Sequence, residues 1–197
     1  MKNVLKMTAL VLCCVALVAC SQKGPAEAAL TAAQTAVDGV KAEATKYAPD
    51  QAKTLMASLT SAREAFDKGD YKMALEVANA IPAKAKEAAA AAAAKKDELT
   101  KSFQDLSASV GPMIEQVKVK IDALSAMKKL PKDMDKAKLE ASKATLADIQ
   151  KATGEAVETF KAGNLADAVT KGNAVKAKVV ETMAALGVTP AAPAAAK

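Results

Sequence analysis

The sequence predicts an all-α fold, and three observations lead to that prediction. Alanine, lysine, glutamate, leucine and methionine are abundant, and all of them are among the best helix formers. Glycine and proline number only 8 and 7, and they stand in small groups between long stretches without either. In those stretches apolar residues recur every three or four positions, which is the spacing of one helix face. We expect an elongated antiparallel helical bundle built from a duplicated three-helix unit.

The first segment, residues 1–19, is typical of a secretory leader. Lys2 and Lys6 precede an apolar run from Met7 to Ala19 that only Thr8 interrupts. A helix over these 13 residues reaches about 20 Å, which is well short of a hydrocarbon core of about 30 Å. The short length of the run therefore predicts a signal peptide and argues against a permanent membrane span.

The end of this run, Leu17-Val18-Ala19-Cys20, resembles the lipobox of bacterial lipoproteins. In that family a diacylglyceryl group is attached to the cysteine, a peptidase cuts before it, and the new amino group is usually acylated. The resemblance implies that Leu17 and Ala19 are recognised by the peptidase and that Cys20 is the lipidated first residue of the mature chain. It also implies no cofactor beyond these covalent chains, and Ser21 resembles the residue that directs sorting to the outer membrane. The alternative is an ordinary signal peptide that leaves Cys20 as a free thiol.

Two helical units are expected after a polar linker at residues 20–25, because Gly111-Pro112 is the strongest interior break. The first unit covers residues 26–110 and the second covers residues 111–186. Proline is also expected at a helix start in each unit, at Pro49 and Pro131, where its missing N–H costs nothing. The predicted helices are 26–47, 50–68, 71–109, 112–129, 132–162 and 164–186.

One short stretch occurs in both units. The first copy, AREAFDKGDYKMALEVANA, begins at Ala62, and the second, AVETFKAGNLADAVTKGNA, begins at Ala156. Glycine is favoured just past a helix end, where the chain turns left-handed, and Asp or Asn after it can cap the next helix. The stretches predict tight corners between antiparallel helices and resemble the GDYxxA corner of alanine-rich bacterial lipoproteins of unknown function. Their constant offset pairs Phe66 with Phe160, Gly69 with Gly163, and Asp70 with Asn164. In each copy the phenylalanine is expected to pack across the corner against the residue two positions after the glycine, which is Tyr71 or Leu165.

The sequence lacks the residues that several kinds of catalytic or metal site require. The chain has no histidine, which is the commonest general base and metal ligand. Cys20 is the only cysteine after the leader, so neither a disulfide within the chain nor a thiolate metal site is expected. Asp133-Met134-Asp135 lacks the glycine and the terminal glutamate of a calcium loop. We therefore expect no catalytic residue, no metal site and no enzymatic activity.

The chain is basic, with 28 Lys and Arg against 22 Asp and Glu. Eight lysines against four acidic residues lie between Lys118 and Lys143. Arg63 is the only arginine and aromatic residues make up 3%, whereas proteins that bind nucleic acid are usually rich in both. We expect no nucleic-acid partner and interpret the lysines as a solvated helix face. The alternative is weak attraction to anionic lipid headgroups or cell-wall polymers.

The last segment, residues 187–197, is an Ala/Pro tail expected to be disordered. It ends in Lys197. A lipid at one end and a lysine at the other resemble the plan of murein-tethering lipoproteins, whose terminal lysine is joined to peptidoglycan. The resemblance implies Lys197 as a point of attachment to the cell wall.

These patterns together predict a non-catalytic lipoprotein at the periplasmic face of the outer membrane. It would contact the lipid bilayer through Cys20 and act as a structural or protein-interaction module for an envelope protein or peptidoglycan. A homo-oligomer is a further expectation, because long Ala/Leu stripes can pair between chains. Two alternatives remain, namely a cell-wall tether through Lys197 and a carrier that holds a hydrophobic ligand in an alanine-lined groove.

Overall fold

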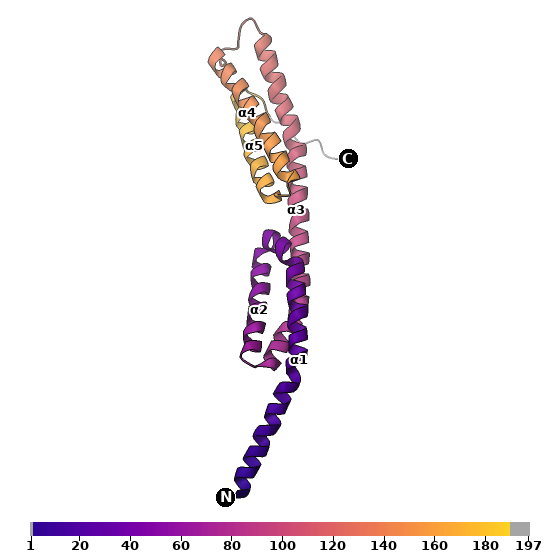
Figure 1. Ribbon diagram of the computed structural model, residues 1–197. Coiled ribbons are helices and arrows are strands. Elements are labelled where there is room, and N and C mark those ends of the chain that lie inside the picture. The colour runs from indigo at the N-terminus through magenta and orange to yellow at the C-terminus, as the bar shows by residue number, and fades with distance from the viewer. Residues whose placement is uncertain (1, 190–197) are drawn as a thin grey trace. The chain divides into compact units, whose positions relative to one another are not determined.

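The computed structural model describes the backbone of residues 2–189 and the side chains of residues 22–189. The described chain is all-α, as the sequence predicts, because it contains five helices and no strand. The helices are α1 (Lys2–Tyr47), α2 (Pro49–Asp67), α3 (Tyr71–Ala126), α4 (Lys136–Lys161) and α5 (Leu165–Ala185), as Figure 1 shows.

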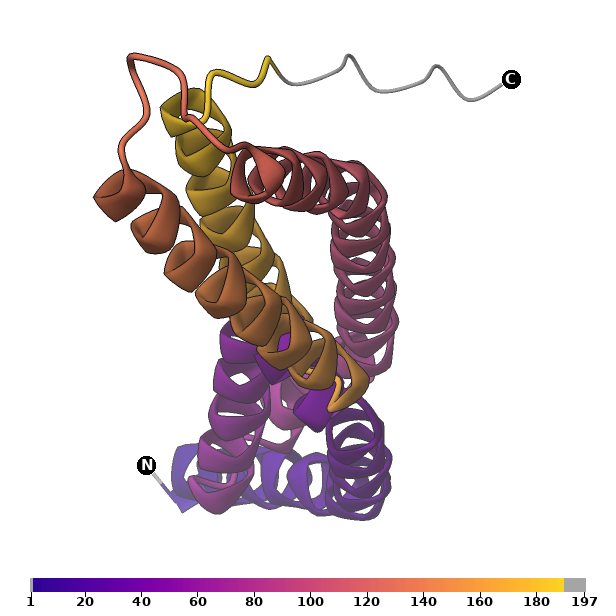
Figure 2. The same cartoon turned by 90° about the horizontal axis from the view of Figure 1, so that it is seen from above.

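The chain divides into two compact units, which we call unit 1 (Met1–Lys96) and unit 2 (Asp97–Lys197). Unit 1 contains α1, α2 and the first part of α3. Unit 2 contains the rest of α3 together with α4 and α5, and Figures 1 and 2 show α4 and α5 side by side. The division thus falls inside α3, whereas the sequence placed it at Gly111.

The predicted helix break at Gly111-Pro112 does not occur, because α3 runs without interruption from Tyr71 to Ala126. A proline inside a helix removes a backbone hydrogen bond and crowds an earlier carbonyl, at a cost of about 3 kcal/mol. Val110 and Met113, on either side of Gly111-Pro112, are buried in the core of unit 2. Because the burial of each such side chain contributes about 1.5–3 kcal/mol, tertiary packing offsets the cost of the proline.

Two further predicted boundaries are wrong. Residues 20–25, expected as a linker, lie within α1, which also contains Pro25. The helix expected from residue 132 begins at Lys136, because Asp135 caps it and its carboxylate accepts a hydrogen bond from the Lys138 N–H at 2.7 Å. By contrast, α2 does begin at a proline, Pro49.

The core of unit 1 consists largely of alanine. Its main hydrophobic cluster joins α1, α2 and the first part of α3. The large members are Val37, Leu55, Leu59 and Ile81. The distance between packed helices depends on the side chains at the contact, so a core of single methyl groups favours a close approach of the backbones. The alanines of this cluster are Ala33, Ala44, Ala52, Ala62, Ala78, Ala85 and Ala88.

The core of unit 2 consists of large aliphatic side chains. Its main cluster joins the later part of α3 with α4 and α5, and its buried members include no alanine. Four of them are fully buried, namely Val117, Ile149, Val179 and Met183. The other buried members are Leu106, Val110, Met113, Ile121, Leu124, Leu139, Val175 and Leu186.

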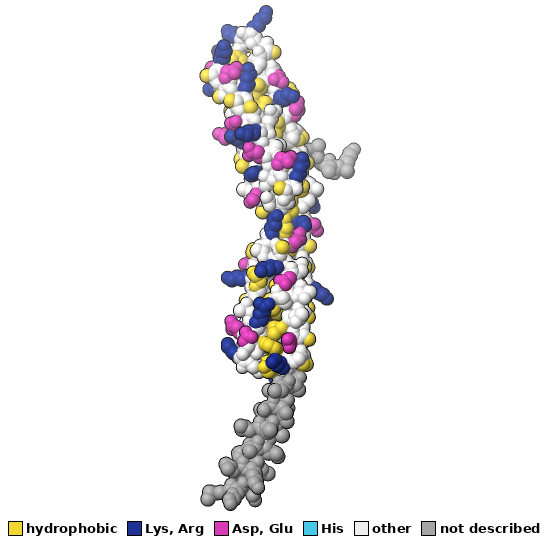
Figure 3. Space-filling model, viewed as in Figure 1, with side chains coloured by type: hydrophobic (Ala, Val, Ile, Leu, Met, Phe, Trp, Pro, Cys, Tyr) yellow, Lys and Arg dark blue, Asp and Glu magenta, His cyan; other side chains and the backbone are white. Residues whose placement is uncertain are grey.

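The surface of both units carries charges of both signs. On the face drawn in Figure 3, basic and acidic side chains are interspersed over unit 1 and over unit 2. Several ion pairs join residues of one helix, such as Lys143 with Glu140 at 2.9 Å and Lys161 with Glu158 at 2.9 Å. Exposed pairs of this kind contribute little to stability, so each unit is stabilised mainly by its own hydrophobic core.

Candidate functional site

The first predicted corner joins α2 to α3 through a left-handed residue, Gly69, whose φ is +80°. Its N–H donates to the carbonyl of Phe66 at 2.9 Å, and the Asp70 N–H donates to the carbonyl of Ala65 at 2.9 Å. This pair of bonds is the Schellman helix ending. The Asp70 carboxylate then accepts a hydrogen bond from the Met73 N–H at 3.0 Å and caps α3, as the sequence predicts.

The second predicted corner, between α4 and α5, has the same backbone geometry. Gly163 has a φ of +75°, and its N–H donates to the carbonyl of Phe160 at 2.9 Å. The Asn164 N–H donates to the carbonyl of Thr159 at 3.1 Å. The corners differ in the cap, because no side-chain hydrogen bond from Asn164 caps α5. Both corners set the direction of the helix that follows, and neither brings chemically reactive side chains together.

The aromatic residue before each corner glycine has a different partner in each unit. Phe66 packs edge-on against Tyr71 across its own corner, with 5.1 Å between ring centroids. In the second copy Leu165 takes the place of Tyr71, and Phe160 stacks instead on Phe103 of α3 at 4.4 Å. The sequence predicts the first contact. It does not predict the second, because Phe103 lies outside the repeated stretch.

The residues predicted for attachment lie outside the part of the chain whose side chains are described. Leu17, Ala19 and Cys20 fall within the backbone of α1, and Lys197 comes after the last described residue. Over the residues that are described, no helix is long and apolar enough to cross a membrane. Lipidation and wall attachment therefore stay predictions from the sequence.

Unit 2 contains an apolar pocket of about 110 Å³ between α3, α4 and α5, which we call the unit 2 pocket. Ser107 and Gly111 of α3 are exposed and lie at its edge. The remaining lining residues are Phe103, Leu106, Val110, Ile114, Thr153, Ala156, Val157, Gly172 and Val175.

Gly172, which the sequence does not single out, lies in the wall of this pocket, where the Leu106 side chain occupies the position of its missing Cβ. It is buried in α5, and a Cβ atom there would collide with Cδ2 of Leu106 and lie 3.8 Å from the Phe103 ring. Glycine therefore permits the close approach of α5 to the Leu106 side chain of α3. The repeat could have indicated this close approach, because Gly172 aligns with Ala78 of the first copy and lies within a helical apolar stripe.

The unit 2 pocket offers few hydrogen-bonding groups. The Thr153 hydroxyl donates to the carbonyl of Ile149 at 2.7 Å, so its hydrogen is already used. The Ser107 hydroxyl lies at the exposed edge. These two hydroxyls are the only polar side-chain groups among the residues that line the pocket. The pocket is therefore suited to an apolar occupant.

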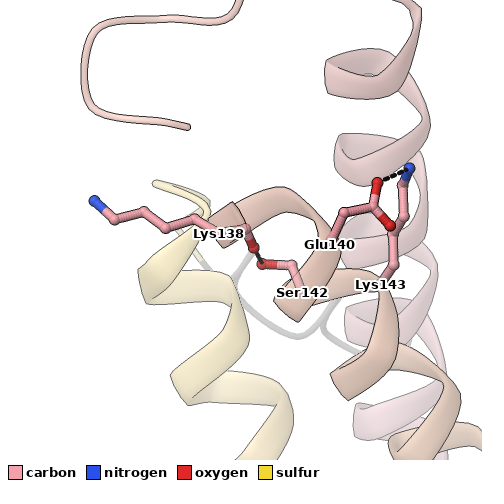
Figure 4. Close-up of polar contacts among 4 residues, drawn as sticks. All are labelled: Lys138, Glu140, Ser142 and Lys143. Atoms are coloured by element: carbon pink, nitrogen blue, oxygen red, sulfur yellow. Dashed lines mark hydrogen bonds and ion pairs between the residues drawn. The ribbon is translucent and has the colours of Figure 1, made fainter. Parts of the chain in front are cut away.

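A polar groove between α4 and α5 is a weaker candidate. It is lined in part by Lys138, Ser142 and Thr182. The Ser142 hydroxyl donates to the Lys138 carbonyl at 2.9 Å, as Figure 4 shows, and Thr182 donates within α5 at 2.7 Å. These hydroxyls have no hydrogen left for a ligand. The Glu140–Lys143 pair, also drawn in Figure 4, extends to the other side of α4 from the Lys138 side chain.

Neither a metal centre nor an unsatisfied polar group is found in the described region. Among residues 22–189, no three side chains of the types that bind metals lie together. In the same region, every buried side-chain nitrogen and oxygen has a hydrogen-bond partner. Comparison with protein-family models, with curated proteins and with solved structures found no match to this chain.

Proposed function

We propose that this chain is a bacterial lipoprotein that holds a helical, non-catalytic interaction module at the periplasmic face of the outer membrane. The observation that carries the proposal is the stretch Leu17-Val18-Ala19-Cys20 at the end of a short apolar leader. Each buried methylene contributes about 0.8 kcal/mol, and a single acyl chain anchors only weakly. Two or three chains on Cys20 make the attachment effectively permanent.

The position of Ala26, the first buried residue among the described side chains, supports a module held close to the membrane. Ala26 is fully buried and packs in a cluster with Ala65 of α2 and Ala74 of α3. It follows Cys20 by six residues of α1, which is a helical rise of about 9 Å. An anchor at Cys20 would therefore lie about a nanometre along α1 from the buried Ala26.

We further propose that each unit is an antiparallel three-helix bundle and that the two arose by duplication. Both corners have the same left-handed glycine and the same pair of backbone hydrogen bonds. At the same offset, the buried Leu55 of α2 pairs with the buried Ile149 of α4. Two related bundles would present two similar helical surfaces to an envelope protein or to a second copy of the chain.

Replacing the lipidated residue tests the anchor. Cys20→Ser should abolish incorporation of radiolabelled palmitate and move the protein from the membrane pellet to the soluble fraction. Mass spectrometry of the wild-type N-terminal peptide should show Cys20 as the first residue, with diacylglyceryl and acyl masses.

The leader supplies matched controls for this test. Cys13→Ser and Cys14→Ser remove the same atoms from residues that are expected to leave with the leader, so both variants should stay lipidated and membrane-bound. The proposal fails if wild-type Cys20 carries no lipid and Cys20→Ser stays in the pellet unchanged.

A further inference from the structure

We propose that the unit 2 pocket is a binding site for a small uncharged apolar molecule of about the size of a benzene ring. The pocket holds about 110 Å³. An engineered protein cavity of about 150 Å³ stays dry and binds benzene or xenon. Because the unit 2 pocket opens at Ser107 and Gly111, a ring can enter from solvent and protrude slightly. The inference is independent of lipidation at Cys20.

The volume of this pocket limits the size of its occupant. A long acyl chain needs several times the space of a benzene ring, so only one end of it would enter this pocket. Large aliphatic side chains, those of Leu106, Val110 and Val175, form much of its wall. The pocket is matched to one ring or to a short branched alkyl group.

Comparison with unit 1 at the offset of the repeat shows where α5 leaves space. Gly172 aligns with Ala78, and Val175 aligns with Ile81. Ala78 and Ile81 are both fully buried members of the unit 1 core. Val175 is one carbon smaller than Ile81, whereas the position of the carbon that Gly172 lacks is taken by the Leu106 side chain.

A third difference lies on α4. Thr153, whose hydroxyl donates to a carbonyl of its own helix, stands where unit 1 has the buried Leu59. Threonine is shorter than leucine, and it lines the pocket together with Ala156, which aligns with the buried Ala62. The smaller side chains of Thr153 and Val175, on two helices, thus leave space in unit 2 where unit 1 has Leu59 and Ile81.

The walls of the pocket are held in place before any ligand arrives. Phe103 is buried and stacks on Phe160 at 4.4 Å, with only 11° between the ring planes. Leu106 and Val110 belong to the main core cluster of unit 2. A ligand therefore meets a preformed apolar surface, which keeps the ordering cost of binding low.

Methyl NMR of the full chain with benzene as the probe tests the proposal. Ring currents from bound benzene should shift the methyl resonances of Leu106, Val110 and Val175 in a saturable way. The methyl resonances of Val37 and Leu55, in the core of unit 1, should stay unchanged. Absence of a saturable shift, or equal shifts in both cores, would overturn the proposal.

Transfer of the unit 1 residues should close the pocket. The triple variant Thr153→Leu, Gly172→Ala, Val175→Ile should bind benzene at least tenfold more weakly than the wild type. Because three core changes can disturb folding, the single variant Val175→Ile is measured alongside and should weaken binding several-fold. Ile81→Val, the matched change in unit 1, should leave binding unaltered.

The proposal fails if a folded filling variant binds benzene as the wild type does. Such a result would leave the lipoprotein proposal intact, because the titration reports nothing about membrane attachment. Conversely, loss of the anchor in Cys20→Ser would leave the benzene shifts unchanged.

Discussion

Units 1 and 2 turn their corners in the same way but fill their cores differently. The Gly69 and Gly163 corners have equivalent left-handed residues and equivalent backbone hydrogen bonds. The main core cluster of unit 1 nevertheless consists mainly of alanine, whereas the main core cluster of unit 2 consists of leucine, isoleucine, valine and methionine. The two corners thus keep one backbone geometry, although the side chains that fill the two main core clusters differ in size.

The two ways of filling a core have different physical consequences. A buried leucine or isoleucine contributes about 1.5–3 kcal/mol through the hydrophobic effect, and an alanine methyl contributes much less. Alanine compensates in part, because it has the highest helix propensity and loses no side-chain entropy on burial. Large side chains can change rotamer to fill a gap, whereas a methyl group cannot. Unit 1 should therefore tolerate the loss of a large side chain less well than unit 2.

Truncation of the equivalent large residues should produce the largest effect and tests this comparison directly. Leu55→Ala and Ile149→Ala should each destabilise their unit by about 2–5 kcal/mol. We expect Leu55→Ala to lie at the upper end, because the surrounding alanines cannot collapse into the cavity. Native-state hydrogen exchange measures the two units separately.

An exposed residue provides the control for these truncations. Val180 is 41% exposed, so Val180→Ala should change stability by less than about 0.5 kcal/mol. An Ile149→Ala variant that costs clearly more than Leu55→Ala would show that core composition does not govern the response to cavities.

Substitution of the corner glycines should have a smaller effect, and it should be the same in both units. Gly69→Ala and Gly163→Ala place a Cβ atom on a left-handed residue, at a cost of about 1–2 kcal/mol each. The two costs should agree within about 0.5 kcal/mol, since the backbone bonds are equivalent. Urea unfolding followed by circular dichroism gives both values.

An ordinary helical glycine provides the matched control for the corners. Gly39 lies inside α1 with no atom near the site of its missing Cβ, so Gly39→Ala should stabilise by up to about 1 kcal/mol. A large difference between Gly69→Ala and Gly163→Ala would contradict the equivalence of the corners.

The smallest predicted effect concerns two glycines of unit 2. Gly154, in α4, has open space at its Cβ position, so Gly154→Ala should stabilise by about 0.5–1 kcal/mol. Gly172→Ala gains the same helix propensity but forces Leu106 to move, so it should gain less or destabilise slightly. Thermal unfolding of both variants measures the difference. Equal stabilisation by the two would mean that Gly172 does not mark a close contact.

The repeated stretch shows which contacts can be predicted from the sequence and which cannot. It predicted Gly69 and Gly163 at left-handed helix ends and the contact of Phe66 with Tyr71, because all of these involve residues close together in the chain. It did not predict the stacking of Phe160 on Phe103, since nothing in the repeat refers to a third helix. The unit 2 pocket was missed for the same reason, because its walls come from three helices.

Local interactions within the amino-acid sequence determined the all-α class, the helix ends at the corner glycines and the leader pattern that ends at Cys20. Each depends on the propensity, spacing or chemistry of neighbouring residues. Only the tertiary structure decided that α3 continues through Gly111-Pro112 and that Gly172 faces Leu106. Both outcomes depend on packing against helices that are distant in the sequence. That packing outweighs the local cost of the proline at position 112, and it places the Leu106 side chain where Gly172 has no Cβ atom.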